Sequence, residues 1–304
     1  MKLRLAALAV LLAGLGAALV WLRGSDPEVV RRIEAERADR YCYVTMNRVA
    51  IAVRDWTAAG RGPLPPRFED LPFEGEVWLR CPLDPRQGEP SYALSSGLPT
   101  PAPSLAIVAR ELRPNHEFTD DRGAPLPAQR VLLGRLSVEF FSPAQVERYL
   151  ADQTAALEFA RGADAEDLVE AFGERRSAFR SAFAARAAAD RTFDEADRDR
   201  LRRGLAAALE KPGPSWVEIE MASALARLGD PRTAVRTALQ ILVEMDRLNY
   251  FERKRLVELV QSQVPAEQVA AYGQGLELGL EPLDTRPESI ARVRKLLEWW
   301  NSRG

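Results

Sequence analysis

Two cysteines and one histidine carry most of the nucleophilic and metal-binding chemistry open to this chain of 304 residues: Cys42, Cys81 and His116. A zinc site made of four cysteines, or of two cysteines and two histidines, needs more thiols or imidazoles than one copy of the chain contains. A Ser-His-Asp triad would have to use His116, and no serine or cysteine lies in a nucleophile motif. The sequence therefore assigns no catalytic residue, no metal ligand and no cofactor, and it favours a protein that is not an enzyme.

Acidic residues near these three leave two further possibilities. Asp84 lies between two prolines in Cys-Pro-Leu-Asp-Pro, where a carboxylate usually accepts backbone N–H groups of a turn. The alternative is a calcium ligand. Glu117, Asp120 and Asp121 form an acidic loop beside His116, which predicts a solvated loop, with metal binding as the alternative. No glycine-rich phosphate loop and no His-Glu-x-x-His motif is present.

The composition is that of a chain able to bury a core, with 46% hydrophobic and 28% charged residues. The formal net charge is −2, so no basic surplus points to nucleic acid as a partner.

An apolar run at the N-terminus follows Lys2 and Arg4 and ends before Arg23. As a helix, this run of residues 5–22 would be roughly 27 Å long, which matches the hydrocarbon core of a bilayer. It predicts a transmembrane anchor with the lipid bilayer as partner. A cleaved signal peptide is the alternative, because Gly16 and Ala18 have the spacing of a cleavage site. The side chains expected to contact lipid are Leu5, Leu8, Leu11, Leu12, Leu15, Leu19, Val20, Trp21 and Leu22.

The rest of the chain divides into two parts that position the candidate residues. A capping box at Ser25 predicts a long helix that continues to about Ala59, where a glycine- and proline-rich turn stops it. Short apolar runs up to residue 142 predict a small antiparallel sheet packed on that helix. From Ser142 onward the periodicity is helical. The expected fold class is α+β, with an anchor (1–24), a helix-plus-sheet head (25–142) and an all-α domain (143–304).

One stretch of the helical half, residues 215–246, resembles a HEAT-like repeat. Small and apolar residues line its first helix, Gly229 is placed to cap that helix, and Asp230-Pro231 is placed to start the second. Because only one clear copy is visible, an ordinary helical hairpin is the alternative.

The first half resembles the pseudopilin-like proteins that are related to type II secretion pseudopilins. The motifs that carry the resemblance are Cys42, Gly62-Pro-Leu-Pro-Pro66, Cys81-Pro-Leu-Asp-Pro85 and Ser91-Tyr-Ala-Leu94. The processing site of that family is absent from the apolar run. The resemblance implies a head that lies outside the cytoplasm, hence a single-pass inner-membrane protein whose bulk is periplasmic or extracytoplasmic.

In such a compartment, Cys42 and Cys81 are expected to form a disulfide that ties the long helix to the sheet. Two buried free thiols or one reactive cysteine are the alternatives. The expected function is protein–protein interaction, in a secretion or pilus-like assembly. The alternative is an extracytoplasmic enzyme or ligand receptor with a pocket between the head and the helical domain.

Overall fold

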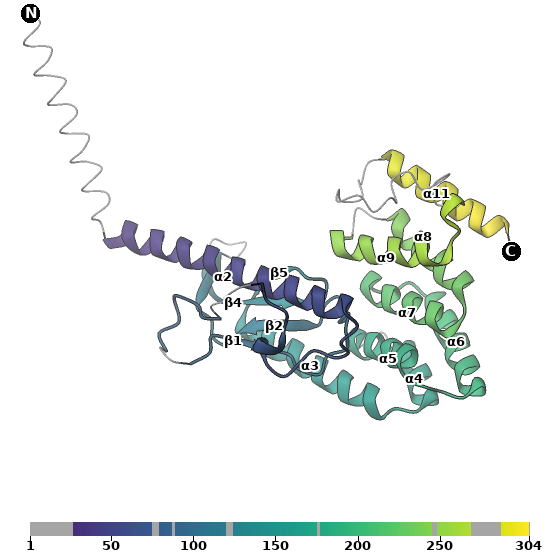
Figure 1. The fold of residues 1–304 in the computed structure, drawn as a ribbon, viewed down its shortest axis with the longest axis horizontal. Helices are drawn as coiled ribbons and strands as arrows, with labels where there is room; N and C mark the ends of the chain where they lie inside the picture. Colours follow the sequence, from purple (N-terminus) through teal and green to yellow (C-terminus); the bar gives the residue numbers. More distant parts are fainter. Residues whose placement is uncertain are drawn as a thin grey trace, which may run out of the picture.

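A computed structural model describes residues 27–74, 79–86, 89–119, 124–174, 177–244, 248–268 and 287–303. Within these ranges, one long helix lies across a small antiparallel sheet, and a group of shorter helices follows (Figure 1). The helices are α2 (Pro27–Ala58), η1 (Phe68–Asp70), α3 (Pro143–Gly162), α4 (Ala165–Phe172), α5 (Ala178–Asp190), α6 (Glu195–Leu209), α7 (Ser215–Leu228), α8 (Pro231–Val243), α9 (Tyr250–Gln263) and α11 (Pro287–Ser302). The strands are β1 (Tyr92–Leu94), β2 (Ile107–Glu111), β3 (His116–Thr119), β4 (Pro125–Leu133) and β5 (Val138–Phe141).

The sheet is organised around β4, its longest strand. One edge of β4 pairs with β2, which in turn pairs with β1. Strand β3 pairs with the first half of β4, and β5 pairs with the second half. All these pairs are antiparallel, as the alternating and short apolar runs predict.

The long helix α2 buries one face against the sheet. Cys42, Met46 and Val49 recur at helical spacing and are fully buried, whereas Val44 and Ile51 are about half exposed. The predicted helix therefore forms, and the position of Cys42 on its inner face is set by the same periodicity.

The helical half shows the predicted helix-end residues. Ser142 and Gln145 form a capping box at the start of α3. Gly229 ends α7 in the left-handed conformation at φ 91°, and the Asp230 side chain accepts the Thr233 amide at the start of α8. The α7–α8 hairpin is present, and its likeness to a HEAT repeat stays a prediction.

Three hydrophobic clusters hold these elements together, and the smallest joins the sheet to the start of α3. The largest one runs from Cys42 on α2, through the sheet and α3–α7, to Ala234. The second gathers α8, α9 and α11 around buried residues such as Leu239 and Leu256. The core is thus continuous across residue 142, where the sequence predicts a change from head to helical domain.

The membrane predictions are corrected by the structure. In the part of the chain that the structure describes, no helix is long and apolar enough to cross a bilayer. The longest, α2, carries charged residues such as Arg31, Glu34 and Arg37, which are costly in hydrocarbon. Over the residues that the structure describes, the fold class is therefore α+β, and this finding contradicts the predicted transmembrane helix and the predicted single-pass inner-membrane localisation. The residues predicted to contact lipid, Leu5 to Leu22, lie outside the described residues.

Candidate metal centre

Four side chains from four separate segments meet beneath α2. Cys42 comes from the inner face of α2, and Cys81 from the loop that carries the Cys-Pro-Leu-Asp-Pro motif. Glu111 is the last residue of β2, and His116 is the first residue of β3. Since β2 and β3 both lie beside β4, the short connection between them brings the carboxylate and the imidazole to the same end of the sheet.

The ligand atoms of these four residues all lie within 4.8 Å of one another. The Cys81 Sγ is 3.7 Å from the His116 Nε2. The same Nε2 is 2.9 Å from the Glu111 Oε1. None of the four residues is more than 5% exposed. We call this group the four-ligand cluster.

A second layer of side chains orients the four-ligand cluster. The other imidazole nitrogen of His116, Nδ1, lies 3.3 Å from the Asp39 Oδ1 on α2. Asp39 also pairs with the Arg130 guanidinium. The Arg130 backbone N–H donates to the second oxygen of Glu111, Oε2, at 2.9 Å. The directions of both the imidazole and the carboxylate are therefore fixed from outside the cluster.

The protonation of the cluster reflects this crowding. A hydrogen bond from Cys42 and a second from His116 lower the pKa of Cys81 to about 6, although burial acts in the opposite direction. The hydrogen bond between the two thiols, together with burial, raises the pKa of Cys42. Burial alone would lower the pKa of His116, but hydrogen bonds to Cys81 and Glu111 outweigh it and raise the pKa to about 9. Burial and the nearby Cys42 raise the pKa of Tyr92. Cys81 is thus the more acidic of the two thiols.

The surroundings argue against nucleophilic catalysis at Cys81. The Cys81 sulfur contacts His116, which in turn contacts Asp39, as in a Cys-His-Asp catalytic triad. However, Cys81 is 3% exposed and His116 is 5% exposed, so neither side chain is presented at the surface of the described residues. Two sulfurs, one imidazole nitrogen and one carboxylate oxygen instead surround a single buried point, and this is the arrangement that a bound cation requires.

The other residues singled out in the sequence have ordinary positions. The Asp84 carboxylate accepts the Arg86 amide at 3.1 Å and pairs with Arg113 at 2.8 Å, as a turn-capping residue does. Glu117 is exposed on β3, on the strand face opposite His116. Asp120 and Asp121 lie outside the described residues.

Cys42 and Cys81, the predicted disulfide pair, are adjacent as expected. Both are free thiols in this structure, and both are buried. The disulfide bond between them stays a prediction.

Sequence reasoning missed Glu111 and Asp39. It compared the cysteines and the histidine with zinc sites built only from thiols and imidazoles, and so left the chain without a metal ligand set. The available signal was Glu111 itself, a charged residue in the apolar run of β2, because a carboxylate buried in a sheet needs a partner.

No family model, curated protein or solved structure matches this chain. The resemblance of the first half to pseudopilin-like proteins therefore stays a prediction, and the function rests on the geometry.

Proposed function

We propose that this protein binds one zinc ion through Cys42, Cys81, Glu111 and His116, and that the ion holds α2 to the sheet. The observation that carries the proposal is the enclosure of four ligand atoms of the types zinc prefers within 4.8 Å of one another.

The distances suit a tetrahedral ion. With usual Zn–S and Zn–N bond lengths, a sulfur and a nitrogen on one zinc are about 3.6 Å apart. The separation between the Cys81 Sγ and the His116 Nε2 is 3.7 Å. The closer contact between His116 and Glu111, at 2.9 Å, is a hydrogen bond that an ion would replace.

The outer contacts match a metal-bound histidine. A ligating imidazole usually donates its second N–H to a carboxylate, and Asp39 stands at that position. Complete burial of the ligands fits a structural site rather than a catalytic one, because a catalytic zinc keeps an open position for water or substrate.

The direct test is the metal content of the full chain, purified without added chelator and measured by elemental mass spectrometry. We expect one zinc per chain, loss of that zinc in Cys81→Ser, and retention in the matched variant Ser95→Ala, which lies outside the cluster. Replacement by cobalt should give thiolate-to-metal charge-transfer absorption that disappears in the same variant.

The predicted disulfide is the competing state of the same two sulfurs. An intact mass two hydrogens lower, no bound metal and no uptake of cobalt by the non-reduced protein would overturn the zinc proposal and support the disulfide.

Protein–protein interaction is a second candidate function, supported by the outer face of α2. Val30, Val44 and Ile51 are exposed there by 37%, 55% and 47%, and their spacing in multiples of seven places them on one side of the helix. The double variant Val44→Asp/Ile51→Asp should abolish crosslinked protein partners, whereas Arg32→Asp should not. Unchanged crosslinking in the double variant would contradict this function.

A further inference from the structure

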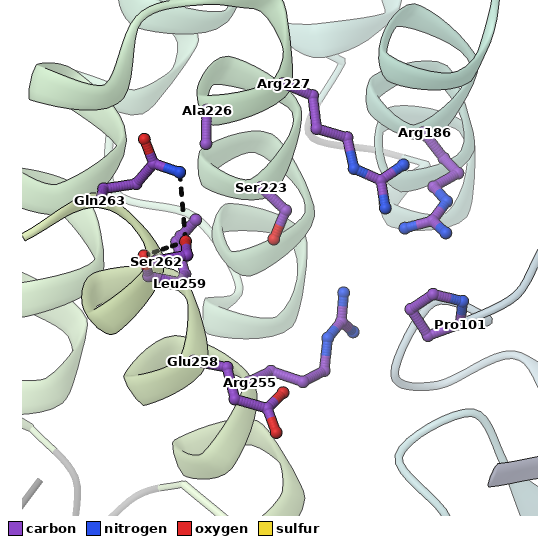
Figure 2. Close-up of a pocket in the computed structure, with 10 residues that line it drawn as sticks. All are labelled: Pro101, Arg186, Ser223, Ala226, Arg227, Arg255, Glu258, Leu259, Ser262 and Gln263. Atoms are coloured by element: carbon purple, nitrogen blue, oxygen red, sulfur yellow. Dashed lines mark hydrogen bonds between the residues drawn. The ribbon is translucent and has the colours of Figure 1, made fainter. Parts of the chain in front are cut away.

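Three arginines from three helices of the helical domain converge on one pocket. Arg186 comes from α5, Arg227 from α7 and Arg255 from α9, and Figure 2 shows their guanidinium groups directed into the same space. The pocket has a volume of about 410 Å³, within the range of small-molecule sites. Pro101, from the loop before β2, closes one side, so the pocket lies between the head and the helices.

Two carboxylates that do not line the pocket pair with these cations. Asp190 is shared by Arg186 at 2.9 Å and Arg227 at 2.5 Å. The fully buried Glu220 pairs with Arg255 at 2.6 Å. Three guanidinium groups thus have two carboxylate partners.

One further carboxylate lines the pocket, and it has its own partner. Glu258 lies 3.7 Å from the Lys254 ammonium group. Glu252, which lines the adjoining pocket, also acts on Arg255, so the four cations and four carboxylates balance as a group. The wall of the arginine pocket itself, however, has three cations and one carboxylate.

Burial makes cations at this wall costly. The Arg186 side chain is only 6% exposed. Burial lowers its pKa, Glu220 and Asp190 raise it, and the neighbouring Arg227 and Arg255 lower it again. A desolvated cation beside two others is stabilised by an additional anion, and arginine binds carboxylates and phosphates through paired N–H groups.

A second pocket adjoins the first. It has a volume of about 370 Å³ and shares Pro101, Arg255 and Glu258 with the arginine pocket. Its other walls are largely apolar and come from both parts of the chain, including Val53, Leu64, Val108, Leu136 and Phe251.

The apolar pocket contains one unpaired polar group. The Ser104 side chain is fully buried, and its hydroxyl has no hydrogen-bond partner among the described residues. A buried hydroxyl without a partner is unfavourable, so this group is available to a ligand.

From this arrangement we infer that the two pockets form one binding site for a small amphiphilic anion. The phosphate or carboxylate group occupies the arginine pocket, and a short apolar chain extends past Arg255 into the neighbouring pocket. The zinc proposal and this inference are independent, because the four-ligand cluster shares no residue with either pocket.

The test is calorimetric titration of the full chain with octyl phosphate, inorganic phosphate and octanol. We expect one octyl phosphate per chain and weaker binding of the other two probes, since each buried methylene contributes about 0.8 kcal/mol, or roughly a factor of four.

Two variants address the two halves of the site. Arg227→Gln, at a side chain that is 47% exposed, should weaken both phosphates by about tenfold through the loss of a charge-assisted hydrogen bond. Ala58→Trp, at the exposed rim of the apolar pocket, should weaken octyl phosphate only.

Matched controls are Arg200→Gln on α6 and Ala59→Trp, neither of which lines either of these two pockets; both should bind as the unchanged chain does. The inference is overturned if octyl phosphate does not saturate one site, if Arg227→Gln leaves its affinity unchanged, or if inorganic phosphate binds equally well. Circular dichroism serves as the check that each variant is folded, and metal content measured on the same samples shows whether the two proposals fail separately.

Discussion

The head and the helical domain both bury ionisable groups, but with opposite polarity. In the head, two sulfurs, an imidazole nitrogen and a carboxylate oxygen converge, so electron-pair donors surround one point. In the helical domain, three guanidinium groups converge and N–H donors surround a pocket. The first arrangement is satisfied by a cation and the second by an anion.

The two sites also differ in how they are enclosed. The residues of the four-ligand cluster are at most 5% exposed, whereas Arg227 at the arginine pocket is 47% exposed. An enclosed ion is acquired with folding and remains bound, while a ligand in an open pocket can exchange. The comparison teaches that the head encloses all of its site charges for stability, whereas the helical domain leaves one of its cations, Arg227, accessible.

The largest expected effect comes from removing a metal ligand. Cys81→Ser should lower the unfolding free energy by about 4 kcal/mol, the stabilisation given by a ligand at a thousand times its dissociation constant. Thermal denaturation should show a melting temperature lower by roughly 10 °C. A chelator should produce the same shift in the unchanged chain and none in the variant. Equal melting of both proteins would show that the head needs no cation.

The helical counterpart is Glu220, which balances Arg255 out of contact with water. Glu220→Gln should cost about 3 kcal/mol in a denaturant titration, because the variant leaves a buried cation without its partner. Asp197→Asn, in an exposed pair with Arg200, should cost less than about 1 kcal/mol. If Glu220→Gln also removed the zinc, the separation between the two regions would be wrong.

A smaller effect is expected from Asp39, which touches the cluster only through His116 and Arg130. Asp39→Asn should reduce zinc affinity by about 10- to 100-fold, because the imidazole loses the carboxylate that orients it. Competition with a zinc-binding dye measures this change. Asp55→Asn, further along α2, is the control. An unaltered zinc affinity in Asp39→Asn would show that Asp39 does not support the His116 ligand.

The smallest effect concerns a charge in the head that is paired without any metal. Burial would raise the pKa of Asp84, but hydrogen bonds from the Arg86 amide and Ser91, with the charge of Arg113, lower it below its usual value. A lowered carboxyl pKa adds stability above the unfolded value of about 4, and this is lost as the pH falls through the folded pKa. Asp84→Asn should therefore cost about 1 kcal/mol at pH 7 and nothing measurable near pH 2. A cost independent of pH would show that the carboxylate charge has no role in this turn.

Much of the fold could be predicted from the sequence where a helix begins or ends at residues that are neighbours in the chain. The extent of α2, the capping box at Ser142, and the Gly229–Asp230 junction all depend on neighbouring residues, and the structure has them. Strand β1 also lies where its apolar run predicted. The sequence did not predict β3, which lies in the acidic segment after His116. It also did not predict the first half of β4, which contains Pro125 and Pro127, residues that are unusual within strands.

The site was only partly predictable for a different reason. Cys42, Cys81 and His116 were singled out by type, but 35 residues or more separate each from the next. Their meeting depends on how α2, the loop at Cys81 and the sheet pack, which no local pattern encodes. The convergence of Arg186, Arg227 and Arg255 was invisible for the same reason, since each belongs to an ordinary charged helix face.

The continuous core across residue 142 bears on how such a protein could have arisen and how it can be dissected. The largest cluster joins Met46 on α2 and Val108 on β2 to Leu168 on α4 and Leu225 on α7. A fragment ended at residue 142 would lack the members of that cluster on α3–α8, and its own members would lose those packing partners and face water. The two parts are therefore expected to fold together, not as independent modules.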